Sequence, residues 1–451
     1  MSRTLSAASD PATIEGDQRR RMLAASLELA AEKGYSALTA SAVIATSHVP
    51  RAAFYRQFRD REECFLAALG GISERLLADV RQAVVRSPPQ RAPFAAVDAL
   101  LHFAADAQPD ARLLLAEMLM GGSRSLDARD RLVESIAQII DERAALAAPD
   151  VSIPELPSSL LIGAACRLLA CLMNAGEREL SAKRDDLLAW IESYASPRPE
   201  RRWQRLIQQG APSPWPYLQP SPLRPSAVSS DGRSRCSPER LRESRRRQII
   251  FAAAEAIDRC GYRDTTVRMI ARSAGVDTRV FYSLFDGKEK LLREANDLLF
   301  GHVIAATAGA FAGGDSWPER VWLAAGALTE SLELNPSLTR VALLQSSAAG
   351  ASNARRVARF TDAFAIFLQE GRQQSLSEPD APPSACSALT QQAIATAVVE
   401  LLCRQSRTAA QPDLAGLSAR IAFISLAPYI GAADAGGYLL QRPAASSSAA
   451  L

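Results

Sequence analysis

The sequence has few residues of the kinds that build metal or disulfide sites. Its seven cysteines are scattered over 451 residues without a CxxC pair, and it has three histidines. Cys166 and Cys171 are five residues apart, which is the wrong spacing for one face of a helix. We therefore expect no metal, no cofactor and no disulfide framework, a pattern typical of proteins in a reducing cytoplasm.

Long apolar segments are also missing. The N-terminal stretch MSRTLSAASDPATIEGDQRRR has no apolar core of the kind found in secretory signals. The segment SSLLIGAACRLLACLM is interrupted by Arg167, so we interpret it as a buried helix rather than a membrane span. These absences predict a soluble cytoplasmic protein without a membrane partner.

Motifs of common enzyme classes are absent as well. The sequence contains no HExxH, no GxSxG and no Walker-type glycine loop, and no pair of carboxylates stands apart from ordinary helix surfaces. We therefore predict that the protein is not an enzyme. Aromatic residues make up 6% of the chain and hydrophobic residues 48%, with many Ala and Leu, and this composition favours an all-α fold.

The chain contains two copies of one sequence plan. A shift of 227 residues aligns the two halves without a gap, with Arg19-Arg20 on Arg246-Arg247, Gly34-Tyr35 on Gly261-Tyr262, Thr39 on Thr266, Phe54-Tyr55 on Phe281-Tyr282, and Phe58 on Phe285. One displacement that holds over about ninety residues indicates a duplication, because chance matches occur at single motifs. The segment 211–237 between the copies is dense in Pro and Ser, which predicts an extended linker.

Periodicity predicts helices along nearly all of each copy. In the second copy, apolar residues recur every four positions in a first helix that ends at Gly261. Thr266 is placed to cap a second helix, and Asp277 to cap a short third helix that begins at Thr278. Further amphipathic segments are expected around 93–106, 109–120, 128–147, 158–175 and 184–195 in the first copy, and around 318–333, 336–346, 354–370, 386–404 and 413–430 in the second.

Two helices joined by a tight turn, the second short and polar on its outer face, form the helix-turn-helix plan. In DTRVFYSLF, Phe281 and Phe285 are four residues apart and face inward, whereas the remaining side chains point outward or along the flank. Arg binds guanine through two acceptors, Thr and Ser are adaptable donors, and a Tyr hydroxyl suits a phosphate. The residues expected to contact DNA are Arg19, Arg20, Thr39, Arg51, Ala52, Tyr55, Arg56 and Arg61 in the first copy, and Arg246, Thr266, Thr278, Arg279, Tyr282, Ser283 and Lys288 in the second.

Positive charge is concentrated in these regions. Residues 18–61 contain eight Lys or Arg and three Asp or Glu, and residues 245–288 contain nine and five. The two segments together carry a net charge of +9, while the whole chain carries +3. Basic side chains therefore gather where phosphates would lie.

Both copies resemble the tetracycline-repressor (TetR) family of bacterial regulators. GYRDTTVRMIARSAGVDTRVFYSLFDGKEKLL follows the N-terminal signature of that family closely, and GYSALTASAVIATSHVPRAAFYRQFRDREECFL follows it more loosely. The resemblance implies two units, each with a three-helix DNA-binding part and a helical part that binds ligand and dimerises. We expect DNA-binding domains at 15–75 and 242–302, helical ligand-binding and dimerisation domains at 76–200 and 303–440, and a linker at 201–238.

The first copy departs from the pattern at two positions. His48 replaces the turn glycine found at Gly275, and Pro50 stands where Asp277 caps the recognition helix. A positive φ at the turn would strain His48, and Pro50 lacks the capping oxygen. These changes leave open an alternative, in which the first DNA-binding unit is degenerate, the chain is a helical sensor or interaction module, and the second unit alone contacts DNA.

TetR-like proteins generally act as homodimers because a symmetric operator needs two recognition helices about one helical turn, roughly 34 Å, apart. This chain already has two such helices. We therefore expect a covalent pseudo-dimer, packed through 158–195 and 386–430, that binds a double-stranded operator with two unlike half-sites, with further homodimerisation still open. The resemblance implies a repressor released by a small apolar ligand. The sequence does not identify ligand-binding residues, since Trp190, Trp203, Trp215, Trp317, Trp322, Met118, Met120 and Met173 suit a core as well as a cavity.

Overall fold

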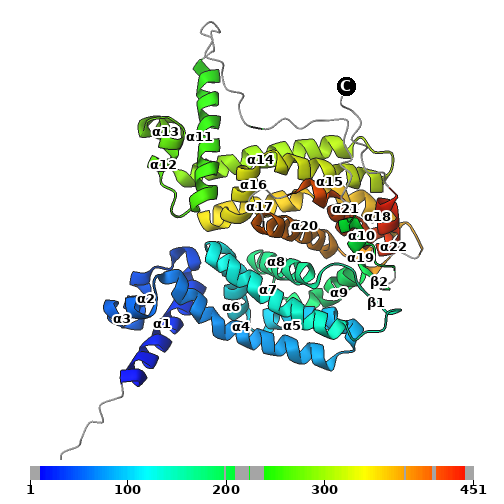
Figure 1. The fold of residues 1–451 in the computed structure, drawn as a ribbon, viewed down its shortest axis with the longest axis horizontal. Helices are drawn as coiled ribbons and strands as arrows, with labels where there is room; N and C mark the ends of the chain where they lie inside the picture. The colour runs from blue at the N-terminus through cyan, green and yellow to red at the C-terminus, as the bar shows by residue number, and fades with distance from the viewer. Residues whose placement is uncertain are drawn as a thin grey trace, which may run out of the picture.

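The computed structural model describes residues 11–197, 200–208, 223, 238–379, 382–408 and 413–441. These residues are almost entirely helical, which confirms the predicted all-α class. The two copies lie side by side, each with a small helical head at the same end of the molecule (Figure 1). The predicted linker 211–237 lies outside the described residues except for position 223.

The first unit begins with a three-helix head, and its long fourth helix leads into a helical body. Its elements are α1 (Pro11–Lys33), η1 (Tyr35–Ala37), α2 (Ala40–Ser47), α3 (Arg51–Gln57), α4 (Arg61–Arg86), η2 (Pro89–Arg91), α5 (Ala92–Asp106), α6 (Gln108–Ala111), the π-helical turn η3 (Arg112–Ala116), η4 (Glu117–Met120), α7 (Ser123–Ala144), β1 (Ser152–Pro154), α8 (Ser158–Asn174), η5 (Leu180–Lys183), α9 (Arg184–Glu192) and β2 (Ala195–Pro197).

The second unit repeats this order and adds short helices near its C-terminus. Its elements are α11 (Pro238–Cys260), α12 (Val267–Ser273), α13 (Thr278–Leu284), α14 (Lys288–Phe311), α15 (Trp317–Glu333), α16 (Pro336–Arg340), the π-helical turn η7 (Val341–Gln345), η8 (Ser347–Ala349), α17 (Ala351–Ala363), α18 (Ile366–Leu376), α19 (Pro383–Cys386), α20 (Leu389–Thr408), η9 (Ala415–Leu417), α21 (Ser418–Ile430) and α22 (Ala432–Leu440).

Most of the predicted amphipathic segments are helices, and the differences lie at their interruptions. The single helix expected over 354–370 is two helices, α17 and α18, separated at Phe364 and Ala365. The segments expected at 109–120 and 336–346 each combine a short α-helix with a π-helical turn. In both units this irregular segment lies under the head, so its backbone is placed to hold the head.

Two features were not expected from the sequence. β1 and β2 form a two-stranded antiparallel ladder, which is too short to give an alternating pattern. In addition, the helix α10 (Trp203–Gln208) occupies the start of the predicted linker and packs on α21 and α22 of the second unit. The buried Glu155 carboxylate accepts the backbone N–H of Trp203 at 2.8 Å, so a first-unit side chain fixes the start of α10.

The two units pack together through α8 and α9 of the first unit and α19 to α22 of the second. Buried aromatic side chains fill one end of this contact: the Tyr194 hydroxyl donates to the Ile424 carbonyl at 2.8 Å, and Trp203 packs against Phe423. Within the described ranges, no helix combines the length and apolar character that crossing a bilayer requires.

Candidate nucleic-acid interface

Each head contains two helices joined by a tight turn. The hydroxyl of Thr39 accepts the backbone N–H of Ala42 at 3.0 Å, and that of Thr266 accepts the N–H of Met269 at 3.2 Å. The two threonines therefore cap α2 and α12, as the sequence predicts. Both are exposed at the head surface, and the DNA contact expected of them stays a prediction.

The turn before each recognition helix requires a left-handed backbone. Gly275 has a φ of 65°, and His48 in the equivalent place has a φ of 52°. Among the described residues, His48 is the single non-glycine residue with positive φ. The first copy keeps the turn geometry at a cost in backbone strain that glycine avoids.

The start of the recognition helix differs in the same direction. The Asp277 carboxylate accepts the backbone N–H of Arg279 at 2.7 Å and caps α13. Pro50 supplies no side-chain bond to α3. Two local departures thus weaken the first head, although its helices form.

The inner faces of both recognition helices are fully buried. Phe54 and Phe58 are 0% and 2% exposed, and Phe281 and Phe285 are 0% and 1% exposed, in agreement with the predicted core role. Each Phe pair lies with ring centroids 5.6–5.7 Å apart. Burial of these rings fixes which side of α3 and α13 faces outward.

The outer faces present the polar side chains that the sequence indicates. Tyr55 is 46% exposed and Tyr282 60%, the guanidinium of Arg51 lies over the ring of Tyr55 at 5.3 Å, and Arg279 is exposed. The other predicted outward residues are Ala52, Arg56 and Ser283, which are exposed, and Thr278, which is half-buried. Arg56 lies 3.6 Å from a carboxylate oxygen of Glu15 in an exposed pair, which DNA phosphate can displace.

The basic residues expected to flank the recognition helices are partly engaged within the protein. Arg246 makes two bonds to Glu294, at 2.7 and 2.5 Å, and lies over Phe285, whereas Arg19 lies over Phe58. Arg20 is exposed and bonds Asp17 at 3.1 Å. Their DNA contacts stay predictions, and the exposed Arg20 is the freest of the three to make one.

Arg61 and Lys288 are bound to the protein's own backbone. The ammonium of Lys288 donates to the carbonyls of Tyr262 and Thr265, and Arg61 donates to the carbonyl of Leu38. Each cation also lies over the ring of the tyrosine after the first helix, Tyr262 or Tyr35. Burial lowers the pKa of Lys288. These contacts tie the start of α4 and α14 to the head, and phosphate contact stays a prediction for both residues.

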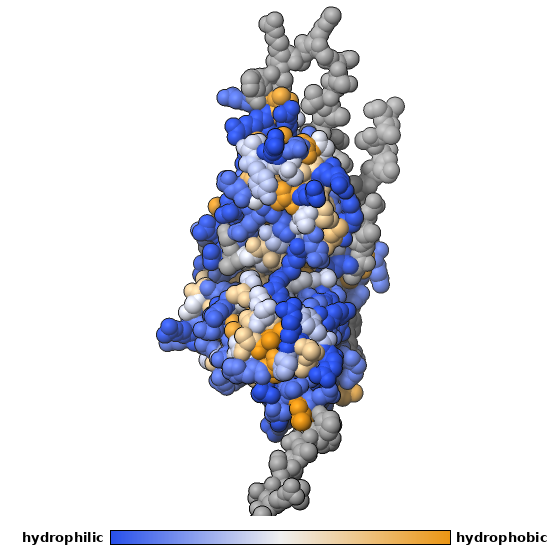
Figure 2. All heavy atoms as spheres, turned by 90° about the vertical axis from the view of Figure 1, so that its left-hand side faces the viewer, coloured by the Kyte–Doolittle hydropathy of each residue, from blue (hydrophilic) through white to orange (hydrophobic). Residues whose placement is uncertain are grey.

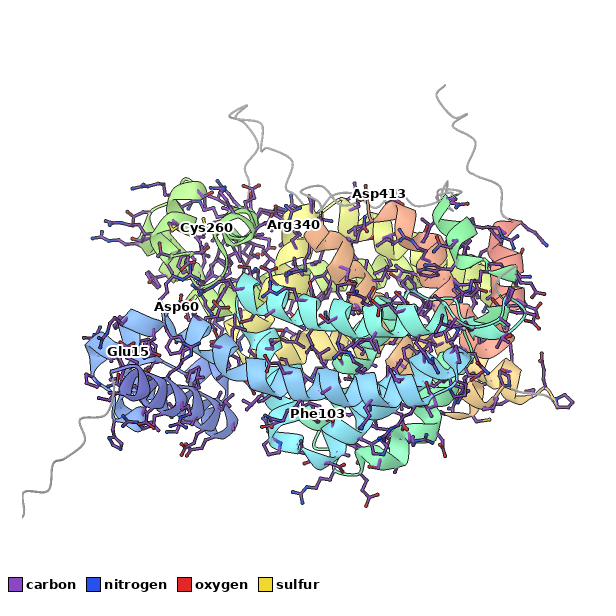
Figure 3. The ribbon with its side chains drawn as sticks, turned by 60° about the horizontal axis from the view of Figure 1, so that its bottom comes forward. Glu15, Asp60, Phe103, Cys260, Arg340 and Asp413 are labelled. Atoms are coloured by element: carbon purple, nitrogen blue, oxygen red, sulfur yellow. The ribbon has the colours of Figure 1, made fainter. Side chains whose placement is uncertain are left out.

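Both heads lie at one end of the molecule. Figure 1 shows α2 and α3 below, and α12 and α13 above, on the same side, and Figure 3 places Asp60 and Cys260 together at that end. The face that carries the heads is largely hydrophilic, with apolar residues in small separate patches (Figure 2). The shared orientation is the geometric condition for two heads to reach one duplex.

Sequence reasoning missed the contacts that hold each head to its helical body. In the first unit the guanidinium of Arg124 bonds Asp60 at 2.6 Å and Glu62 at 2.9 Å, and Glu62 also accepts the Ser125 hydroxyl at 2.8 Å. Burial alone would raise the pKa of Asp60, but the N–H of Glu63 and the Arg124 guanidinium outweigh it and lower that pKa. We call Asp60, Glu62, Arg124 and Ser125 the Arg124 network.

The second unit holds its head differently. Arg340 on α16 pairs with Asp258 near the end of α11, with Nε 2.7 Å from the carboxylate. The side-chain oxygen of Gln345 on η7 accepts the backbone N–H of Tyr262 at 3.2 Å, where Glu117 accepts the N–H of Tyr35 at 2.8 Å in the first unit. Neither network repeats at the displacement of 227 residues, so the duplication gives no signal for them.

The heads also meet across the two units. Arg263 of the second unit donates to the Met120 carbonyl at 3.3 Å, and its guanidinium lies 5.1 Å from the ring of Tyr35. The position of the second head is therefore linked to the first unit. No group of His, Cys, Asp or Glu side chains suited to a metal ion occurs in the part of the chain that the structure describes.

Comparison with known families agrees with this geometry. The model for "Bacterial regulatory proteins, tetR family" matches residues 22–68 and again residues 249–295. The matched segments begin and end 227 residues apart, the displacement that aligns the two copies. The chain is a tandem member of the tetR family. It is accordingly a regulator of transcription whose partner is DNA.

Two further comparisons add little to this tetR-family assignment. No curated protein matches the chain. Among solved structures, the fatty acid degradation regulator FadR from Bacillus halodurans aligns over 43% of this chain and 97% of its own length, with 20% identity and a TM-score of 0.36. A similarity of this size does not indicate a shared ligand.

We predict that His48→Gly stabilises the first head by about 1 kcal/mol, because glycine adopts the left-handed turn without strain. Gly275→Ala is the matched change and should destabilise the second head by a similar amount. Urea denaturation followed by hydrogen exchange of each head measures both effects. A destabilising effect of His48→Gly would contradict this account of the turn.

The two tethering networks predict separable mobility of the heads. Arg124→Ala should increase amide hydrogen exchange in α2 and α3 and leave α12 and α13 unchanged, because the ion pairs that it removes belong to the first unit. Arg340→Ala should do the reverse. Equal responses of both heads to either change would show that the networks do not hold the heads individually.

Proposed function

We propose that the chain is a ligand-responsive repressor that acts as a covalent pseudo-dimer on an operator with two unlike half-sites. The observation that carries this proposal is the placement of two exposed recognition helices at the same end of one paired molecule. Covalent linkage makes the pairing of the units intramolecular, so that pairing does not depend on protein concentration.

The difference between the recognition helices supports an asymmetric operator. The first presents Arg51, Ala52 and Arg56 where the second presents Thr278, Arg279 and Ser283. Arg at different positions along the two helices selects guanine at different positions in the two half-sites. Selection of bound DNA from random oligonucleotides should return two unlike half-sites centred about one helical turn apart, and strict palindromes would contradict the proposal.

We predict that both heads contribute to affinity. The double change Arg51→Ala with Tyr55→Phe, and the corresponding change Arg279→Ala with Tyr282→Phe, should each weaken operator binding by roughly tenfold or more, because each removes a base and a phosphate contact. Arg75→Ala, at an exposed pair on α4, is the control and should have no effect. Fluorescence anisotropy at fixed salt concentration measures all three.

This experiment also tests the alternative in which the first head is degenerate. The strained His48 and the missing cap at Pro50 favour that alternative. Unchanged affinity after the first-head change, with a loss after the second-head change, would favour it over the pseudo-dimer.

An apolar cavity in the second unit supports ligand control. It has a volume of about 80 Å³ and lies among helices α14, α15, α17, α20 and α21 and the turn η7. Leu328, Phe360, Phe364, Ile394 and Leu343 are among its lining residues. The lining hydroxyls of Thr307 and Ser425 bond carbonyls of their own helices, so the cavity favours an apolar ligand. The tryptophans and methionines considered from the sequence are not among the described lining residues.

The cavity offers a physical route to the second head. Leu343 lines it from η7, and two residues later Gln345 holds the backbone N–H of Tyr262. A cavity of about 80 Å³ is smaller than a typical ligand site, so a bound ligand has to displace part of the lining. Displacement of η7 would shift the head, and the two states would bind DNA with different affinity.

We predict that Gln345→Ala uncouples the ligand from DNA. In the unchanged protein, an apolar compound that raises the melting temperature should also change operator affinity, since linkage is reciprocal. In Gln345→Ala the same compound should still raise the melting temperature but change affinity less. Gln374→Ala on α18 is the matched control. Melting scans of a panel of straight-chain and aromatic compounds, followed by anisotropy, test this, and undiminished coupling in Gln345→Ala would contradict the route.

A further inference from the structure

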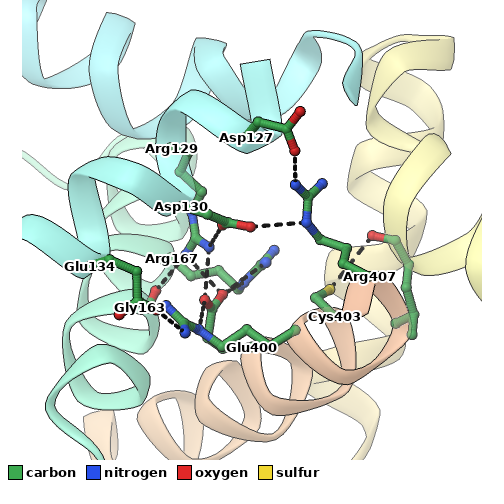
Figure 4. Close-up of polar contacts among 11 residues, drawn as sticks. Asp127, Arg129, Asp130, Glu134, Gly163, Arg167, Glu400, Cys403 and Arg407 are labelled. Carbon is green, nitrogen blue, oxygen red and sulfur yellow. Dashed lines mark hydrogen bonds and ion pairs between the residues drawn. The ribbon is translucent and has the colours of Figure 1, made fainter. Parts of the chain in front are cut away.

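The contact between the units is built around one buried carboxylate. Glu400 on α20 of the second unit is 0% exposed and lies against α7 and α8 of the first unit (Figure 4). The Arg129 guanidinium donates to its two oxygens at 2.7 and 2.8 Å, and Arg167 donates at 3.0 and 3.2 Å. Arg404 of its own helix adds a bond at 3.1 Å. We call Glu400, Arg129, Arg167 and Arg404 the Glu400 cluster.

The cluster is charged and closely packed. Burial would raise the pKa of Glu400, but the attraction of Arg129 and Arg167 holds it well below its usual value. A Cβ at Gly163 would lie 2.3 Å from a Glu400 oxygen, so glycine is needed at this position on α8. The Gly163 carbonyl in turn accepts Arg129 at 3.0 Å. The first unit therefore supplies a complete receptor for a carboxylate: two guanidinium groups and a gap in the helix surface.

This receptor and its carboxylate are not interchangeable between the units. The sequence of α8, SSLLIGAACRLLACLMN, contains no acidic residue, and the sequence of α20, LTQQAIATAVVELLCRQSRT, contains no glycine. Two first units would bury Arg129 and Arg167 without a carboxylate. Two second units would bring two Glu400 carboxylates together against helices without the gap. Burial of an uncompensated charge is strongly unfavourable.

Peripheral ion pairs repeat the same complementarity. Arg404 bonds Glu134 at 2.7 Å, and Arg407 lies 2.9 Å from Asp130. In both pairs the second unit supplies the cation and the first unit the carboxylate. These partly exposed pairs add little affinity, but they penalise wrong pairings in the same direction.

We propose that the surface formed by α7 and α8 accepts only the α20 surface of the opposite unit, so that the two units of this chain select each other and reject copies of themselves. The consequence is a regulator that cannot form symmetric pairs, either from its own units or with units that lack the Glu400 cluster. This deepens the pseudo-dimer part of the proposed function but concerns pairing alone, so it is tested without DNA.

The experiment uses the full chain with a protease site inserted between positions 224 and 237. After cleavage, the protein is mixed with isotope-labelled cleaved protein and followed by native mass spectrometry during dilution. Every pair should contain one first and one second unit, with labelled and unlabelled units exchanged. Homodimers of either unit, or separated units at micromolar concentration, would overturn the proposal.

Two variants and a control sharpen the result. Glu400→Gln keeps the shape but leaves two buried guanidinium groups unpaired, and should weaken pairing of the cleaved units about 100-fold or more. Glu134→Gln, at a 57% exposed carboxylate, should change pairing less than about fivefold. The triple change Glu400→Met, Arg129→Met and Arg167→Leu should restore pairing and permit homodimers, because apolar groups pack without discrimination. Unaltered pairing in Glu400→Gln, or continued exclusion of homodimers by the triple variant, would overturn the proposal.

Discussion

The buried carboxylate of Glu400 is the interaction on which the arrangement of the molecule depends. A charge removed from water is tolerated only with opposite charges and hydrogen bonds at close range, and Arg129 and Arg167 provide them from the other unit. The cost of leaving these groups unpaired fixes the register of α8 against α20. Because each long helix, α4 or α14, joins its head to its body, that register also sets where the two heads lie relative to each other.

The heads are held by irregular backbone rather than by regular helix. In each unit a π-helical turn, η3 or η7, precedes the side chain that accepts the N–H of the tyrosine following the first helix. Such turns rearrange more easily than a continuous helix, since their hydrogen bonds are already displaced from the regular pattern. One of them also lines the apolar cavity, so the same segment touches the site of a ligand and the base of a DNA-binding head.

The duplication made much of the fold predictable. One displacement located both helix-turn-helix motifs, the capping threonines Thr39 and Thr266, and the strained turn at His48, because these depend on local backbone rules. The Glu400 cluster and the Arg124 network could not be found in this way. Arginine is abundant in the chain, and the partner of a given arginine lies up to 271 residues away, so spacing along the sequence carries no signal for the pair. The helix α10 was missed because its burial depends on Glu155 and on the second unit.

The central claim is that one chain supplies both reading heads of a dimeric regulator. Native mass spectrometry of the protein bound to its selected operator measures this directly. The account predicts one chain per duplex at every protein concentration that gives full binding. A complex that forms with two chains per duplex, and never with one, would contradict it.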